Sequence, residues 1–104
     1  MNEFAPPVSS FDEIAQRLTG KAERLRAFGV EAVTVFGSFA TGAFDGGSDV
    51  DLIVEPGPDT FRALIELQDV LESALMRRVD VLTRAAAKPS LLAEAAQVGR
   101  KITL

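Results

Sequence analysis

The sequence predicts a small α/β domain in which helices pack on a single β-sheet. Segments rich in β-branched residues alternate along the chain with segments whose apolar residues recur every three or four positions, as in an amphipathic helix. Such alternation is typical of helices packed on a sheet. The chain has 104 residues, a length that ordinarily forms one domain with one core. No internal repeat, low-complexity stretch or linker divides it.

The first part of the chain is predicted to be a short arm followed by a long helix. Two prolines indicate a flexible N-terminal arm over residues 1–9, which leaves residues 10–104 as the folded domain. Ser10 and Glu13 have the spacing of a capping box, in which each side chain bonds to the backbone N–H of the other residue. The apolar spacing that follows predicts a helix over residues 11–28.

The remainder of the chain is predicted to alternate between strands and helices. β-branched runs predict the strands, a stretch with four glycines between the first two strands predicts a loop, and prolines or possible cap residues precede the helices. In chain order we expect a strand over residues 30–36, a loop over 37–47, a strand over 50–55, a helix over 61–75, a strand over 78–82, a helix over 89–98 and a short edge strand over 102–104.

The composition excludes several kinds of chemistry. With neither Cys nor His, the chain has no thiolate nucleophile, imidazole base or zinc site made of those side chains. Any catalysis must therefore use carboxylates, hydroxyls, backbone groups and a hard cation. The net charge of −4 argues against direct nucleic-acid binding, which usually goes with a basic excess. No apolar run resembles a membrane span or a signal peptide, so we expect a cytoplasmic protein.

Two carboxylates at the start of the second predicted strand are candidates for binding a metal. Asp49 and Asp51 are two residues apart, so in a strand both point to the same face, with Ile53 beyond them. Such carboxylates repel each other, and one is pushed toward protonation unless a cation lies between them. No Lys or Arg is adjacent, and oxygen ligands suit magnesium or manganese better than zinc. We therefore predict a divalent metal site here.

Asp80 and the pair Gly37-Ser38 complete the candidate site. Asp80 lies in a short apolar strand, where a carboxylate is costly to bury unless it has a use. If this strand lies beside that of Asp51, the three aspartates form a cluster able to hold two metal ions, and Asp80 would orient or deprotonate an attacking hydroxyl. Gly37 allows the backbone to approach a ligand closely, and the Ser38 hydroxyl can donate to a phosphate oxygen.

Each feature by itself also has a purely structural explanation. Gly-Ser after a strand is most often only a turn, Asp-x-Asp can mark a solvated strand entrance, and Asp80 could simply face water. The full pattern, Gly-Ser followed after ten residues by Asp-x-Asp, arises by chance in roughly one chain of this length in a thousand. It also lies in the strand–turn–strand context that its chemistry requires. The combination favours a functional site.

These residues resemble the active-site signature of the DNA polymerase β-like nucleotidyltransferase superfamily. Within it, the chain is most similar to the minimal nucleotidyltransferases of bacteria and archaea. The likeness in order and length extends over nearly the whole chain from about residue 10. The matching segments are Val33–Gly42, Ser48–Glu55 and Val79–Thr83.

The resemblance implies a palm built on a mixed β-sheet flanked by helices, with two magnesium ions and a nucleoside triphosphate donor. By position, Gly37 and Ser38 would bind the triphosphate. Asp49, Asp51 and Asp80 would be metal ligands, with Asp80 also the candidate base. Members of this branch are commonly antitoxins paired with a HEPN-domain ribonuclease toxin, which they silence by transferring AMP from ATP to a toxin tyrosine. The implied partners are therefore ATP and a HEPN toxin in a hetero-oligomer.

One position departs from the family's pattern. Many relatives carry Arg where this chain has Thr41, and a guanidinium binds phosphate through two parallel hydrogen bonds that Thr cannot reproduce. The basic residues that could replace it are Arg77, Arg78 and Arg84, and the sequence does not distinguish among them.

Two classes of function stay open on the sequence alone. Ser38 and the three aspartates favour an enzyme that transfers AMP to a protein hydroxyl. Thr41 favours instead a catalytically weak or inactive module that keeps the fold and neutralises its partner by binding. A small-molecule nucleotidyltransferase fits less well, because such enzymes generally need an additional substrate-binding domain, for which 104 residues leave no space.

Overall fold

A four-stranded mixed β-sheet with the strand order β3-β2-β1-β4 forms the centre of the protein. The structure, a computed structural model, describes residues 6–104. β1 runs antiparallel to both β2 and β4, whereas β2 and β3 run parallel. The mixed sheet flanked by helices that the sequence predicts is therefore confirmed. The strands are β1 (Val30–Phe36), β2 (Val50–Pro56), β3 (Val79–Thr83) and β4 (Arg100–Thr103).

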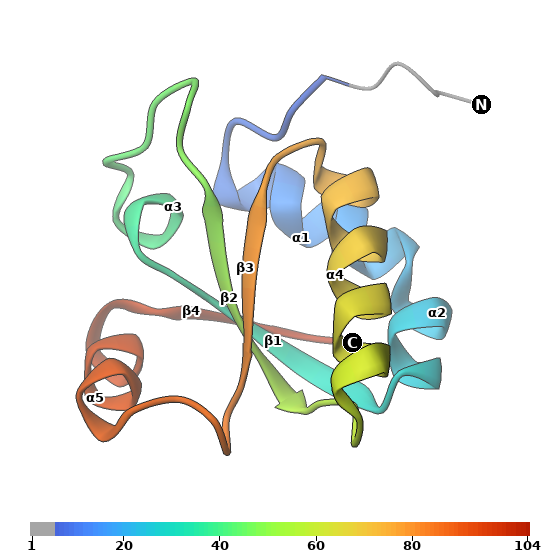
Figure 1. Ribbon diagram of the computed structural model, residues 1–104. Helices are drawn as coiled ribbons and strands as arrows, with labels where there is room; N and C mark the ends of the chain where they lie inside the picture. The colour runs from blue at the N-terminus through green and yellow to red at the C-terminus, as the bar shows by residue number, and fades with distance from the viewer. Residues whose placement is uncertain (1–5) are drawn as a thin grey trace.

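Helices cover both faces of the sheet, but unequally. Figure 1 shows α1, α2 and α4 on one side of the sheet and α5 on the other, while the single turn α3 directly follows β1. Of the helices within residues 6–104, none combines the length and the apolar character needed to cross a bilayer. The helices are α1 (Phe11–Gly20), α2 (Ala22–Ala27), α3 (Ser38–Thr41), α4 (Phe61–Leu75) and α5 (Pro89–Val98).

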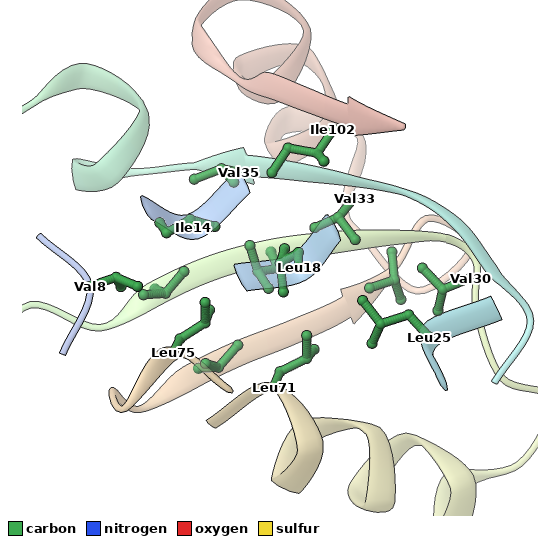
Figure 2. Packing of buried hydrophobic residues seen from close by; sticks show 14 of the residues in the cluster. Val8, Ile14, Leu18, Leu25, Val30, Val33, Val35, Leu71, Leu75 and Ile102 are labelled. Carbon is green, nitrogen blue, oxygen red and sulfur yellow. The ribbon is translucent and has the colours of Figure 1, made fainter. Parts of the chain in front are cut away.

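The larger core lies between the sheet and the helices α1, α2 and α4. Alternation along β2 directs Val50, Leu52 and Val54 into this core, as the two-residue period of a strand requires. Figure 2 shows Leu18 of α1 and Leu71 of α4 pointing toward the same layer of strand side chains. The polar residues of β2 are consequently directed to the opposite face.

A second, smaller core lies under α5 on that opposite face. Phe36 of β1 and Ile53 of β2 pack against Ala95 of α5, with leucines of β3 and α5 around them. At the end of the sheet beyond this cluster, Asp49 and Asp80 are exposed. The small core therefore supports the floor of the candidate site without covering it.

The single helix predicted over residues 11–28 is wrong, because this segment forms two helices. The break is at Lys21, which has φ −110° and ψ 15° and whose N–H donates to Leu18 O at 3.0 Å. Glycine weakens a helix interior, and Gly20 directly precedes the break. On either side of it, Leu18 and Leu25 are both fully buried in the larger core. Because residues seven apart also share one face of a continuous helix, this burial is compatible with either arrangement, and the break coincides with the glycine.

The packed part of the chain reaches further toward the N-terminus than the predicted boundary at residue 10. Residues 1–5 of the predicted arm lie outside the described residues, but Val8 is fully buried and its N–H donates to a carbonyl at the end of α4 at 3.0 Å. The Ser10 hydroxyl accepts the Glu13 N–H at 3.1 Å, as predicted. The Glu13 carboxylate, however, accepts from the Ser9 N–H at 3.3 Å and the Ser9 hydroxyl at 2.9 Å.

The last strand is an edge strand, as predicted, but it begins two residues earlier than residue 102. β4 starts at Arg100, which pairs with Val35, and ends at Thr103, which pairs with Ala32. The backbone hydrogen bonds of β1 set these limits, because β1 offers partners over that whole length.

Candidate active site

The aspartates identified from the sequence come from two neighbouring strands and lie at one end of the sheet. In the parallel pair of β2 and β3, Asp51 lies directly opposite Asp80. Opposite residues in paired strands point to the same face. Asp49 directly precedes β2, and its charge acts on Asp51. The structure therefore shows that β2 and β3 are neighbours, which the sequence alone did not establish.

The Gly-Ser turn lies against the same pair of carboxylates. Gly37 follows Phe36, the last residue of β1, which pairs with Asp51 of β2. A Cβ atom on Gly37 would lie 2.5 Å from Asp51 Oδ2, so close that the turn or the carboxylate would have to shift. Gly37 also has φ +70°, a conformation that L side chains rarely adopt. The turn and the aspartates thus form one site, and glycine is required where they meet.

Asp51 has a perturbed acid–base equilibrium. Its side chain is half-buried, and this burial is the largest of the causes that raise its pKa from 3.8 to about 6. Asp80 raises the pKa further through its charge and through a hydrogen bond between the two side chains, and the charges of Asp49 and Glu94 add to this. Binding a proton, or a cation placed between Asp51 and Asp80, removes the unfavourable interactions of the Asp51 negative charge. Perturbations of this kind are typical of functional sites.

The donor set fits magnesium. Asp51 and Asp80 supply adjacent carboxylate oxygens, and magnesium is usually held by one or two carboxylates together with phosphate oxygens of a substrate. Among residues 6–104, no group of three or more His, Cys, Asp or Glu side chains is gathered closely enough to hold a metal by itself. Asp51 and Asp80 form a close pair, with Asp49 exposed directly before β2, and a metal held by all three aspartates stays a prediction.

The α3 turn carries Ser38 at its start and Thr41 at its end. Ser38 directly follows Gly37 and is partly exposed. The Thr41 hydroxyl lies 3.4 Å from Ser38 O and 3.5 Å from Gly37 O, so it is directed back at its own turn. Thr41 therefore supplies neither a cation nor a hydroxyl directed away from the turn.

Two of the three arginines considered as replacements are engaged elsewhere. Arg77 donates from Nε and Nη1 to backbone carbonyls of the N-terminal segment and of the loop before β2. Arg84 follows the end of β3 opposite to Asp80, and its Nη1 lies 3.7 Å from Glu55 Oε1. Arg78, exposed and immediately before β3, is the remaining candidate for contacting a phosphate.

Sequence reasoning missed one acidic residue near the site, Glu94 of α5. Glu94 is exposed, and its charge contributes to the raised pKa of Asp51. Leu91 and Ala95 of the same helix pack on the sheet, and a residue three positions after Leu91 lies near that packed face. This spacing is visible in the sequence, but it acquires meaning only once α5 is placed over β2.

Removing the charge of Asp51 is expected to stabilise the metal-free protein at neutral pH. Because the pKa of Asp51 is higher in the folded protein than its ordinary value, the folded state binds this proton more tightly, and stability is lost as the pH rises from about 4 to above about 6. Asn at this position has no carboxyl group to titrate, so the stability of Asp51→Asn lacks this dependence on pH. After allowance for solvent screening of a half-exposed group, we expect the variant to gain about 1–2 kcal/mol relative to the wild type between about pH 4 and pH 7.5.

Urea unfolding of both proteins in the presence of EDTA, at the two ends of this pH range, measures the effect. Titrations common to both proteins largely cancel in the difference between them. A difference in unfolding free energy that does not change with pH would contradict a raised pKa at Asp51.

Comparison with known proteins agrees with the geometry of the site. The nucleotidyltransferase domain family matches residues 18–102, which is most of the chain. The protein adenylyltransferase MntA of Thermococcus cleftensis is 36% identical over 85 residues, which cover 79% of this chain and 85% of that protein.

Two solved structures share the fold. A candidate minimal nucleotidyltransferase superposes with a TM-score of 0.70 and 27% identity, over 88% of this chain and 94% of that chain. A toxin–antitoxin structure with AMP-PNP superposes with a TM-score of 0.69 and 25% identity, over 84% of this chain and 70% of that chain. The chain therefore belongs to the nucleotidyltransferase-domain family and, within it, to the minimal nucleotidyltransferases whose signature its sequence carries.

Proposed function

We propose that this nucleotidyltransferase transfers AMP from ATP to a protein hydroxyl, a tyrosine of a HEPN-domain toxin, and acts as the antitoxin of that toxin. The observation that carries the proposal is the approach of the Gly37 turn to the Asp51–Asp80 pair. Nucleotidyl transfer needs a phosphate-binding turn and metal-binding carboxylates at one place. The similarity to an archaeal protein adenylyltransferase supports a protein acceptor. The similarity to a toxin–antitoxin structure with AMP-PNP supports ATP as the donor and a toxin as the partner.

The proposed reaction exchanges an anhydride bond for an ester bond at the α-phosphorus of ATP. The acceptor hydroxyl oxygen attacks this phosphorus, the bond to the oxygen that bridges to the β-phosphate breaks, and pyrophosphate leaves. The hydroxyl proton passes to a carboxylate, for which we propose Asp80, because it is exposed and lies beside Asp51. Magnesium, as two ions when bound, would neutralise charge on the triphosphate and on the attacking oxygen.

In this proposal the two halves of the site have separate roles. Gly37 presents its backbone to the triphosphate without a side chain in the way, and Ser38 contributes a hydroxyl. Asp49, Asp51 and Asp80 hold the metal. Asp49 is exposed beside the closer pair, and phosphate oxygens of the nucleotide would complete the ligand set of the metal.

A second candidate function, neutralisation of a partner by binding alone, is favoured by one observation. The Thr41 hydroxyl is directed at its own turn, and no guanidinium stands in the α3 turn where many relatives have one. A loss of phosphate binding at this position would weaken catalysis without altering the fold. The following experiment distinguishes the two functions.

The test uses ATP labelled at the α-phosphate and, in parallel, ATP labelled at the γ-phosphate. Each is incubated with magnesium, this protein and a purified HEPN-domain candidate partner, beside the double variant Asp49→Asn/Asp51→Asn. We expect label from the α position on the partner, and none from either position with the double variant, because the variant lacks the metal-binding charge. Tyr→Phe exchanges in the partner then locate the acceptor.

The other outcomes exclude the proposal in different ways. Label transferred only from the γ position would mean a kinase reaction and would contradict the mechanism. No label from either position, with the partner still bound and inhibited, would establish neutralisation by binding. The absence of an arginine at Thr41 would then be the first explanation to test for the lack of transfer.

A further inference from the structure

We propose that Arg77 is a positioning residue, whose guanidinium holds the connecting loop (residues 42–49) between α3 and β2 and so fixes Ser38 relative to Asp49. The catalytic consequence rests on the proposed function. The hold on the loop rests on contacts of this chain alone and can be tested separately.

Arg77 joins the connecting loop to the N-terminal segment. It lies between α4 and β3, far from the loop in sequence, and is half-buried. Its Nη1 donates to the carbonyl oxygens of Asp45 at 3.3 Å, Gly46 at 3.2 Å and Ser48 at 3.0 Å. Its Nε donates to Val8 O at 2.7 Å, and Val8 is fully buried in the larger core. One guanidinium thus links the loop to a fixed part of the domain.

The same guanidinium lies over an aromatic stack at the other end of the loop. The Cζ atom of Arg77 is 5.0 Å from the centroid of the Phe39 ring. Phe39 is buried in α3 and stacks on Phe44 of the connecting loop, with ring centroids 4.3 Å apart and planes inclined by 8°. A cation over an aromatic face is attracted by the negative face of the ring. Arg77 therefore contacts both α3 and the loop that leaves it.

The loop's internal hydrogen bonds shape it but do not attach it to the rest of the protein. Asp45 Oδ1 accepts the Gly47 N–H at 2.8 Å, and Ser48 Oγ accepts the Asp45 N–H at 2.8 Å. Within residues 6–104, the side-chain hydrogen bonds that connect this loop to other segments all come from Arg77. Arg77 is therefore the main polar attachment of the loop.

The two residues next to these contacts belong to the proposed site. Phe39 directly follows Ser38, and Ser48 directly precedes Asp49. If the loop moves, Ser38 and Asp49 shift relative to Asp51, which the sheet holds in place. A displacement of about 1 Å at a reacting centre can lower the rate about 100-fold.

The order of the loop can be measured without any activity, because the chain contains neither Trp nor Tyr. Phe44→Trp places a single fluorophore in the connecting loop, against Phe39. In this background we compare Arg77→Lys with the parent. Lysine keeps the charge but lacks the planar fork of donors. We expect lower tryptophan anisotropy and faster amide exchange in the loop.

Arg17→Lys is the matched control. Arg17 is also half-buried and also donates to backbone carbonyls, of Ala74 at 3.2 Å and of Pro6 at 2.5 Å, but it does not contact the loop. Arg17→Lys therefore measures the effect of losing arginine contacts to the N-terminal segment when the connecting loop is not involved. We expect Arg17→Lys to keep the loop order and the rate of the parent.

The outcomes separate this inference from the proposed function. Unchanged anisotropy and exchange in Arg77→Lys would overturn the hold on the loop. If the loop loosens, Arg77→Lys without the tryptophan should lower kcat for AMP transfer by about 10-fold or more, beyond any change in KM for ATP. An unchanged kcat would overturn the positioning role. Absence of AMP transfer in the wild type would contradict the proposed function, while anisotropy and exchange would still decide whether Arg77 holds the loop.

Discussion

Asp51→Asn is expected to lower AMP transfer about a thousandfold, and Asp49→Asn to lower it in the same direction, while both variants stay folded. Asparagine keeps the size of the side chain but has no negative charge to hold a cation. A loss of about 4 kcal/mol of transition-state stabilisation corresponds to a thousandfold in rate. Neither aspartate is in a core, so neither change opens a cavity. Single-turnover transfer of α-label to the partner measures the rate.

Asp69→Asn is the control for this prediction. Asp69 is exposed on α4, the helix on the face of the sheet opposite to the carboxylates, and the chemical change is the same. We expect the control to transfer AMP at the wild-type rate. Near wild-type transfer by Asp51→Asn would show that this carboxylate does not hold the metal.

Gly37→Ala is expected to lower AMP transfer about 100-fold, because its Cβ atom and the Asp51 carboxylate cannot occupy their present positions together. The new Cβ would lie 2.5 Å from Asp51 Oδ2. Either the turn or the carboxylate must shift, and either shift separates the proposed phosphate-binding turn from the proposed metal ligands. The positive φ of +70° adds strain of about 1–2 kcal/mol, which lowers the free energy of unfolding.

Gly42→Ala separates the strain from the close approach. Gly42 ends the same α3 turn with φ +84°, but no atom lies within 4 Å of where its Cβ would be. Gly42 has ψ 5°, in the left-handed helical region, whereas Gly37 has ψ −148°, a combination that essentially only glycine adopts. We therefore expect Gly42→Ala to lose less free energy of unfolding than Gly37→Ala while keeping most of the transfer rate. Equal rates for the two variants would mean that the approach of Gly37 to Asp51 does not matter for catalysis. Urea unfolding and α-label transfer, measured on both proteins, give the comparison.

Most of the secondary structure could be predicted because its signals are local. The strand predicted over residues 30–36 is β1, and the helix predicted over 89–98 is α5. Both follow from the types and spacing of adjacent residues. The errors concern boundaries: a continuous apolar spacing did not reveal the break at Lys21, and β4 begins at Arg100, which pairs with Val35.

The candidate site could be predicted in its residue types but only partly in its arrangement. The two-residue period of a strand predicts Asp49 and Asp51 on one face, but Asp49 lies directly before β2, so its orientation stays a prediction. The structure places Asp51 opposite Asp80, whereas the expected gathering of Asp49 with them around a metal stays a prediction. How far a side chain at a strand entrance extends toward its neighbours depends on burial and pairing, which a residue pattern does not contain.

The sequence by itself determined the chemistry available to this protein: no imidazole or thiol, the aspartates Asp49, Asp51 and Asp80, and a glycine-serine turn after a strand. The tertiary structure alone decided which of these groups meet. Asp51 faces Asp80 because β2 and β3 pair in parallel at one register, Gly37 lies against Asp51 because β1 ends beside the start of β2, and Arg77 reaches the connecting loop from beyond α4. The physical reason is that these contacts join distant segments, whose relative positions follow from core packing and strand register rather than from neighbouring residues.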